Sequence, residues 1–481
     1  MKSRNIKVNA VLNSIKTLMT ILFPLITTSY LSRVLGKDGY GMFNYSVSIV
    51  SYFILIAGLG INTYGIREGA KVRDNRVQES QFSSELFTLN ILSTIISYAC
   101  LFLLLIFSKS LLPYRIYIIV ISITIAFTTL GADWINSIYE DFWYLTLRYI
   151  IVQVVSIFLM LIFVRNKEDL LKYVGVYLFS QVGANVANIF YIRRYVRLRL
   201  VINKSVFSHL IPVLILFASS VAVTIYVNSD ITILGIIKGD EAVGVYSVAS
   251  RIYTGAKQIA TAGTVVAIPR LAFYIGQKNK EEYNLLLENI LNLLISVTIP
   301  LFTGLFMISH QVMLIIGGVG YDEGAITLQI LSLASIFSIV AYYYAQCILI
   351  PNFREKYFLI ATVIAALINI VGNFIVIPFW SHIGAALTTL ISEFFTMAFC
   401  AIYSRGYHGS SLDKKAVLST IASSCAVIIV CSISGLIIKN YLLSALVSIT
   451  ISAIAFLAIM EVMKNKYVTG IFDSVIRKIK K

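Results

Sequence analysis

Apolar runs of about 20 residues follow one another along the whole chain, and they constrain the fold more than any other feature. A helix needs about that many apolar residues to cross a bilayer. Of the 481 residues, 58% are hydrophobic and 13% are charged, which is too apolar for a soluble domain. The first run is longer than the apolar region of a signal peptide, and no small-residue cleavage site follows it. We therefore predict an all-α polytopic membrane protein that retains this first helix.

Polar breaks divide the sequence into fourteen predicted spans, and the basic residues support that number. With the N-terminus inside, and with residues within about four positions of a span end counted with the adjoining loop, the inner segments carry 26 Lys and Arg, the outer loops carry 9, and four lie deeper inside spans, out of 39. Inner loops are enriched in Lys and Arg, so both termini are predicted to be cytoplasmic. The net charge of +16 is then a topology signal and an attraction to anionic lipid, with no nucleic-acid partner. The spans lie near 8–31, 41–65, 85–107, 115–137, 142–164, 168–192, 207–229, 243–268, 285–309, 325–349, 356–378, 383–404, 415–437 and 441–462.

A short repeat predicts two related halves. "LGKDGYGMFNYS" follows the first span and "KGDEAVGVYSVA" follows the seventh, and an offset of 203 residues pairs Gly36 with Gly239 and Gly41 with Gly244. The repeat unit holds six spans, an even number, so both halves enter the membrane from the same side and are related by a pseudo-two-fold along its normal. The predicted parts are six-helix bundles at 1–195 and 205–405, joined by a basic cytoplasmic linker at 192–207, and two further helices with a basic cytoplasmic tail at 412–481.

The sequence lacks the motifs of a membrane enzyme or an ATP-driven pump. The longest outer loop, 309–324, has roughly 15 residues, too few for an aqueous catalytic domain. There is no G-x-x-x-x-G-K-[ST] or H-E-x-x-H sequence, and the five cysteines lie in apolar runs without C-x-x-C spacing. We predict that the chain moves a substrate and is not an enzyme, with no metal and no cofactor. A proton or sodium gradient stays open as the driving force.

The eighth span carries a polar stripe with two cations. A central charge costs about 2.5–3.5 kcal/mol on insertion scales, so the two cations must meet water, an acid or an anionic ligand. One interpretation is a pair of buried salt bridges, and the other is an anion site. Spacings of three, four and seven place on one helix stripe Ser247, Ser250, Arg251, Thr254, Lys257, Gln258 and Thr261.

Other spans supply polar partners for this stripe. Each amide alone is typical of a hydrogen bond between helices. Together they predict a cavity between the halves with net positive character, which suits a phosphorylated, hydroxyl-rich head group. The residues are Lys16 in the first span, Gln181, Asn185 and Asn188 on one face of the sixth, Asn369 and Asn373 on one face of the eleventh, and Glu393 near the middle of the twelfth.

Four charges lie where the fourth span meets the fifth: Asp133, Glu140, Asp141 and Arg148. Asp133 and Glu140 are seven apart and share a face if the helix continues that far. One interpretation is a salt bridge from Arg148 to Glu140 or Asp141 that joins the two helices. The other is an inner gate whose carboxylates bind protons or repel a second anion.

Several stretches carry a family likeness, in this order along the chain: "SYLSRVLGKDGYGMFNYSVSIVSYFILIAGLGINTYGIREGAKVRDN" (29–75), "DWINSIYEDFWYLTLRYIIVQ" (133–153), "NSDITILGIIKGDEAVGVYSVASRIYTGAKQ" (228–258), "IPRL" (268–271) and "NFIVIPFWSHIGAALTTLISE" (373–393). They resemble bacterial polysaccharide repeat-unit flippases of the Wzx type, within the multidrug, oligosaccharidyl-lipid and polysaccharide exporter superfamily. The chain departs from many members at Ser29, where they have Pro, and at Ser137–Ile138, where they have Gln–Gly. The last two spans match only in apolarity.

The resemblance implies that undecaprenyl-diphosphate-linked oligosaccharide units move from the inner to the outer leaflet of the bacterial cytoplasmic membrane, by alternating access of two bundles. The diphosphate would meet Arg251, Lys257 and either Lys16 or Arg148. Sugars would meet the polar faces that hold Gln258, Thr254, Gln181, Asn185, Asn369 and Asn373. Gating or ion coupling would fall to Glu393, Asp133, Glu140 and Asp141. Expected partners are membrane lipids and, further, a polysaccharide polymerase and chain-length machinery.

Two transport alternatives stay open. A drug/cation antiporter of the same superfamily should have an acidic cavity, and the two cations of the eighth span argue against it. A flippase for the peptidoglycan lipid precursor would share the polyprenyl diphosphate, so the sequence separates it poorly.

Overall fold

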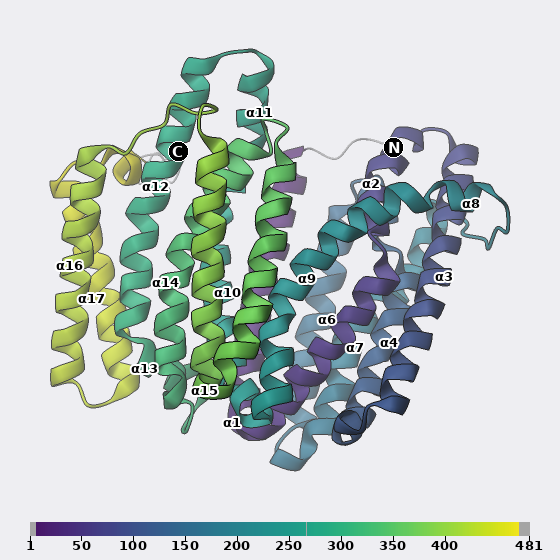
Figure 1. The fold of residues 1–481 in the computed structure, drawn as a ribbon, viewed down its shortest axis with the longest axis horizontal. Coiled ribbons are helices and arrows are strands. Elements are labelled where there is room, and N and C mark those ends of the chain that lie inside the picture. The colour runs from purple at the N-terminus through teal and green to yellow at the C-terminus, as the bar shows by residue number, and fades with distance from the viewer. Residues whose placement is uncertain (1–5, 266, 471–481) are drawn as a thin grey trace. The chain divides into compact units, whose positions relative to one another are not determined.

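The computed structural model describes residues 6–265 and 267–470, and every regular element in these residues is helical (Figure 1). Short 3₁₀ turns and one π-helix, Tyr343–Leu349, connect the α-helices. The α-helices are α1 (Ile6–Gly58), α2 (Ile61–Val72), α3 (Arg76–Phe107), α4 (Arg115–Gly131), α5 (Asp133–Ile138), α6 (Phe142–Phe163), α7 (Leu170–Tyr191), α8 (Ser205–Ser208), α9 (Leu210–Lys238), α10 (Asp240–Val265), α11 (Ile268–Gly276), α12 (Lys280–Met307), α13 (Ser309–Gly317), α14 (Ala325–Tyr342), α15 (Glu355–Ser404), α16 (Lys414–Ile437) and α17 (Tyr441–Val462).

Ten helical stretches in the described residues are long and apolar enough to cross a membrane. Two of them, Leu18–Val72 with 55 residues and Glu355–Ser404 with 50 residues, are about twice as long as one span needs. Each contains a non-helical residue, Gly36 in α1 (φ 72°) and Ser381 in α15 (φ 48°), close to the break expected between two spans. An all-α multi-pass membrane fold is therefore confirmed, whereas the number fourteen stays a prediction.

The chain divides into two compact units. The first comprises Met1–Gly235 and Gly239–Gly244, and the second comprises Ile236–Lys238 and Val245–Lys481. The division thus falls near the start of α10 and not in the 192–207 linker, because most of α9 packs with the first unit. The division into two six-helix bundles, at 1–195 and 205–405, stays a prediction.

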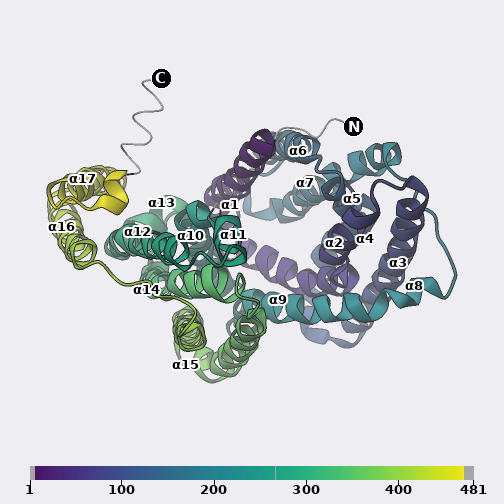
Figure 2. The ribbon, with the colours of Figure 1, turned by 90° about the horizontal axis from the view of Figure 1, so that it is seen from above.

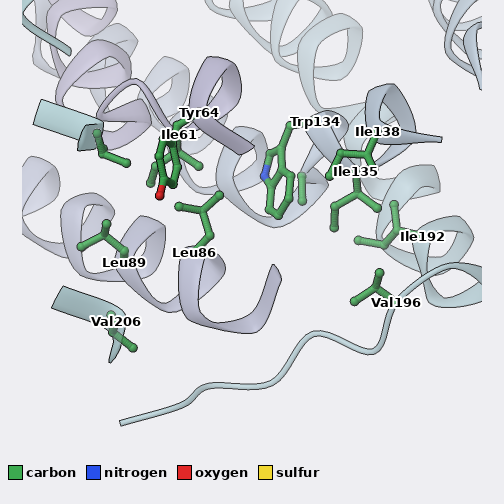
Figure 3. Packing of buried hydrophobic residues seen from close by; sticks show 12 residues of the cluster. Ile61, Tyr64, Leu86, Leu89, Trp134, Ile135, Ile138, Ile192, Val196 and Val206 are labelled. Carbon is green, nitrogen blue, oxygen red and sulfur yellow. The ribbon is translucent and has the colours of Figure 1, made fainter. Parts of the chain in front are cut away.

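Buried apolar side chains hold α9 and the linker to the first unit (Figure 3). Trp134, Ile135 and Ile138 of the short helix α5 meet residues of α2 and α3 there. Val206 of α8 and Val213 of α9 belong to the same cluster. This cluster fixes α5, and α5 begins with one of the four charged residues at the junction of the fourth and fifth spans.

The repeated glycines lie in reciprocal contact within the first unit. A Cβ atom on Gly41 would overlap the carbonyl oxygen of Asp240, and one on Gly244 would overlap the carbonyl oxygen of Lys37. The offset of 203 residues that relates the two glycines also relates Lys37 to Asp240. The two helices can therefore cross this closely only because both positions lack a side chain. Lys37 Nζ also bonds Glu241 Oε1 at 3.0 Å.

In the second unit, α16 and α17 lie side by side and α16 packs on α12 (Figure 2). Asn465, which follows α17, connects the chain to both of these helices. Its Nδ2 donates to Ser296 Oγ of α12 at 3.1 Å and to Ser419 Oγ of α16 at 2.8 Å.

All five cysteines are free, and three of them are buried. The described residues hold no group of His, Cys, Asp and Glu that could bind a metal ion.

The predicted topology can be tested at two exposed positions. Ile202 lies in the linker and is 100% exposed, and Val319 lies in a predicted outer loop and is 95% exposed. In a chain whose native cysteines are replaced by serine, cysteines at these positions should react with a membrane-impermeant thiol reagent from opposite sides. Labelling of both from one side would remove a span from the predicted number.

Candidate functional site

A break between α4 and α5 creates a polar site in the first unit. Ala132 adopts the left-handed conformation (φ 44°, ψ 49°), so the helix stops at Gly131 and restarts at Asp133. The interruption frees the carbonyl of Gly131, which accepts a hydrogen bond from Asn188 Nδ2 at 2.6 Å. The same amide donates to Asp133 Oδ1 at 3.0 Å. Asn188 therefore fixes the direction of the Asp133 carboxylate.

Arg148 of α6 completes this site. Its Nη2 contacts Asp133 Oδ2 at 2.7 Å, and its Nη1 donates to the carbonyl oxygen of Ala184 in α7 at 2.9 Å. The Arg148 side chain is 6% exposed, whereas that of Asp133 is 46% exposed. The guanidinium also lies over the ring of Tyr144, 5.4 Å from its centroid. A buried cation is thus balanced by a carboxylate that still reaches the solvent-accessible side of the site.

The ion pair borders a cavity of about 370 Å³ inside the first unit. Two of its lining residues also hold donors, Arg148 Nε and Trp134 Nε1, that have no hydrogen-bond partner in the described residues. Both atoms are closed off from solvent, so the polar surface of the cavity comes from its other side chains. The other polar lining residues are Asn62, Asn90, Thr128, Thr129, Tyr149, Ser180, Gln181 and Asn185.

The predicted salt bridge from Arg148 to Glu140 or Asp141 was wrong, because Arg148 pairs with Asp133. Glu140 bonds Arg73 Nη1 at 2.9 Å, and Asp141 Oδ2 accepts from the hydroxyls of Tyr191 at 2.6 Å and Tyr195 at 2.7 Å. Asp133 and Glu140 do not share a helical face, because the helix ends after Ile138 and Glu140 is left-handed (φ 56°). The short helix α5 turns Asp133 toward Arg148 and the next two acids toward other partners.

A second charged site lies in the second unit, between α10 and α15. Lys257 Nζ contacts Glu393 Oε1 at 3.0 Å, and the Tyr253 hydroxyl donates to the same oxygen at 2.9 Å. Glu393 is 7% exposed. The mid-span carboxylate is therefore neutralised by one of the two cations that the sequence offered.

The other cation, Arg251, lies on the exposed face of α10 with Thr254 and Gln258. It makes no hydrogen bond or ion pair with any residue in 6–265 or 267–470. The predicted polar stripe therefore separates into a paired lysine on the Glu393 side and an unpaired arginine on an exposed face. This difference decides which cation is available to an anionic ligand.

The structure places the remaining predicted residues in different settings. Asn369 and Asn373 are fully buried in α15, where Asn373 Nδ2 donates to Asn369 Oδ1 at 3.1 Å and Asn373 accepts from Thr388. They join the two arms of α15. Gln181 and Asn185 line the first-unit cavity. Lys16 lies in α1, and its side chain is outside the described residues.

Sequence reasoning missed several residues of these sites. Asn62, Asn90 and Trp134 line the first-unit cavity, and Tyr253 bonds Glu393. Asn90 is an amide inside a long apolar helix, a signal that could have identified it. Tyr253 lies four residues before Lys257, on the same helix face, which is a weaker signal because tyrosines are frequent in this chain.

The Asp133–Arg148 pair yields a stability prediction. Asp133→Asn removes the counter-charge of a buried guanidinium and should lower the free energy of unfolding by about 2 kcal/mol, less than for a fully buried pair because Asp133 is half-exposed. The double variant Asp133→Asn with Arg148→Met should recover part of this loss. Thermal unfolding of the purified protein measures both, with Glu168→Gln, an exposed acid of the first unit, as the control. A double variant less stable than Asp133→Asn would contradict the assigned pair.

Fold and sites define a multi-pass α-helical membrane protein with charged and amide groups inside its spans. The chain belongs to the family described as polysaccharide biosynthesis protein, whose model matches residues 6–275. A protein of Escherichia coli (strain K12) named "Putative O-antigen transporter" is 25% identical over 389 residues, which cover 77% of this chain and 90% of that protein.

Solved structures show the same fold. The lipid II flippase MurJ in an inward closed conformation matches with a TM-score of 0.75 and 18% identity, over 95% of this chain and all of that chain. An inward-facing multidrug resistance MATE family transporter of the MOP superfamily matches with a TM-score of 0.61 and 14% identity, over 82% of this chain and 97% of that chain. The chain therefore has a transporter fold, as the resemblance implied.

Proposed function

We propose that the protein is a flippase for oligosaccharide repeat units linked to undecaprenyl diphosphate, which it moves from the inner to the outer leaflet of the bacterial cytoplasmic membrane for surface polysaccharide synthesis. The family, the transporter of Escherichia coli and the fold of a lipid II flippase support this proposal. The two units would alternate access to the head group while the polyprenyl tail stays in lipid. Both termini would be cytoplasmic.

The proposed substrate class, a lipid-linked diphosphate, rests on the unpaired Arg251. An exposed guanidinium without a partner is available to an anion, and its planar fork fits phosphate oxygens in pairs. Lys257 is held by Glu393 and would contribute less. Sugar hydroxyls would be bound by amides such as Gln181 and Asn185, which line the first-unit cavity.

The positive charge of Arg251 also bears on the two alternative transport functions. A drug/cation antiporter would bring a cationic cargo to an unpaired arginine, which costs binding energy. A flippase for the peptidoglycan precursor would use the same diphosphate contact, so only the sugar separates it. Asp133 and Glu393 are the acids we propose for coupling to a proton or sodium gradient, and Glu140 and Asp141 lie at the proposed inner gate. A polysaccharide polymerase and chain-length machinery would receive the product.

Deletion of the gene from its own cell tests the proposal. We expect surface polysaccharide to disappear and the lipid-linked repeat unit to accumulate in the inner leaflet, with growth and drug sensitivity unchanged. Restoration by the plasmid-borne gene is the control. Arrested cell-wall synthesis would favour the peptidoglycan alternative, and drug sensitivity alone would favour the antiporter.

A further inference from the structure

The second unit contains a polar cavity that the proposed transport does not use. It has a volume of about 570 Å³ and shares no lining residue with the first-unit cavity or the Lys257–Glu393 pair. Three segments form it: the turn between α11 and α12, the turn after the π-helix, and the loop between α15 and α16. The distribution of Lys and Arg predicts all three on the cytoplasmic side.

The lining is cationic and contains no carboxylate. Lys278 and Lys280 contribute two ammonium groups, and no Asp or Glu belongs to the lining residues. Neither lysine forms an ion pair in the described part of the chain. Burial lowers the pKa of His408, so at pH 7 its imidazole is a neutral contact. The charge of the cavity therefore comes from the two lysines alone.

Hydrogen bonds hold polar groups at the floor of this cavity. Asn352 Nδ2 donates to the Tyr283 hydroxyl at 2.9 Å, and the backbone N–H of Gly409 donates to Asn284 Oδ1 at 2.8 Å. The Tyr283 hydroxyl can still donate its own proton, and Asn284 keeps its amide nitrogen as a donor. The floor thus offers donors to an acceptor-rich ligand.

The backbone directs the two lysines to the same end of α12. Lys278 is left-handed (φ 56°), and Asn279 caps α12 by accepting from the N–H of Glu282. Lys280 then begins a helix of 28 residues, whose first turn also carries Glu281 and Glu282, outside the cavity lining. Tyr407, another lining residue, is held under the Arg354 guanidinium, which is 4.4 Å from the ring centroid. The site thus combines a cationic edge with an aromatic wall.

We propose that this cavity binds the phosphate group of an anionic ligand at the cytoplasmic face, separately from the transported substrate. Its volume is that of a small-molecule site. Basic pockets between membrane helices on the cytoplasmic side bind lipid phosphates, and two lysines with neutral donors suit a single phosphate. A phospholipid head group and a soluble phosphate ester share this chemistry.

Binding to the purified full chain in detergent tests the proposal. Its melting temperature is measured with dihexanoyl phosphatidylglycerol, glycerol 3-phosphate and dihexanoyl phosphatidylcholine. We expect phosphatidylglycerol to stabilise the protein and phosphatidylcholine not to do so. In the double variant Lys278→Gln, Lys280→Gln the affinity should fall roughly 30-fold. The double variant Lys414→Gln, Lys415→Gln removes the same charge from the same side, outside the cavity, and should bind like the wild type.

The outcomes separate the two sources of phosphate. Stabilisation by phosphatidylglycerol alone assigns a lipid head group, and stabilisation by glycerol 3-phosphate as well assigns a soluble ester. Equal stabilisation by phosphatidylcholine, unchanged affinity in the cavity variant, or an equal loss in both double variants would overturn the site. Since no transport is measured, failure here would leave the proposed flippase function untouched.

Discussion

Replacing Arg251 with alanine is expected to reduce surface polysaccharide to the level of a cell without the transporter, while the variant stays folded in the membrane. The guanidinium is exposed and has no partner in the described residues, so its removal leaves no buried charge without a counter-ion. Arg251→Lys should keep only part of the export, because charge survives but the paired geometry does not. The measurement is surface polysaccharide in a flippase-deleted cell, with membrane abundance checked by immunoblot.

The Lys257–Glu393 pair supplies the control for this result. Lys257→Ala leaves the buried carboxylate of Glu393 without a counter-ion, so it should reduce abundance as well as export. Adding Glu393→Ala should make the Lys257 variant milder, whereas it should do nothing for Arg251→Ala. Rescue of Arg251→Ala by Glu393→Ala would assign Arg251 to charge neutralisation and would contradict a diphosphate contact. Near-wild-type export from Arg251→Ala alone would do so as well.

The positions of most spans could be predicted because the bilayer imposes their length. The predicted span 142–164 corresponds to Phe142–Phe163, and 441–462 corresponds to Tyr441–Val462. Each needed only a sustained apolar run with polar ends. One kink was predicted in the same way, because the break expected between 378 and 383 falls at Ser381, the non-helical residue where two helices meet within α15.

Side-chain partners were less predictable, because single backbone torsions decide them. Ala132 is left-handed, and alanine carries no signal for that conformation as glycine would. Without this break, Asp133 would not have turned toward Arg148. On α10, helical spacing placed Arg251 and Lys257 on one stripe, but the two are six residues apart, which separates them by about 120° around a helix. That separation was enough for Lys257 to reach Glu393 while Arg251 stayed exposed.

A second large loss of export is expected when alanine replaces Gly41 or Gly244, the two glycines at which α1 and α10 touch. A Cβ atom at Gly41 would overlap the Asp240 carbonyl, and one at Gly244 would overlap the Lys37 carbonyl, so α1 and α10 must separate in either variant. Backbone atoms cannot rotate away as a side chain could. We expect Gly41→Ala and Gly244→Ala each to lose most of the export, with reduced abundance in the membrane. The same complementation assay and immunoblot measure both effects.

Because the contacts of the two glycines are reciprocal, a variant with alanine at both positions is the sharper test. If one methyl group already forces the helices apart, the second enters space that has been opened, so Gly41→Ala with Gly244→Ala should lose little more than either single variant. Gly175→Ala in α7 is the matched control, because nothing lies within 4 Å of its Cβ position. It should be neutral or more stable by up to about 1 kcal/mol, since alanine favours a helix over glycine. Strictly additive losses at Gly41 and Gly244 would show that the two glycines act at independent contacts, and would remove the physical reason why the repeat pairs them.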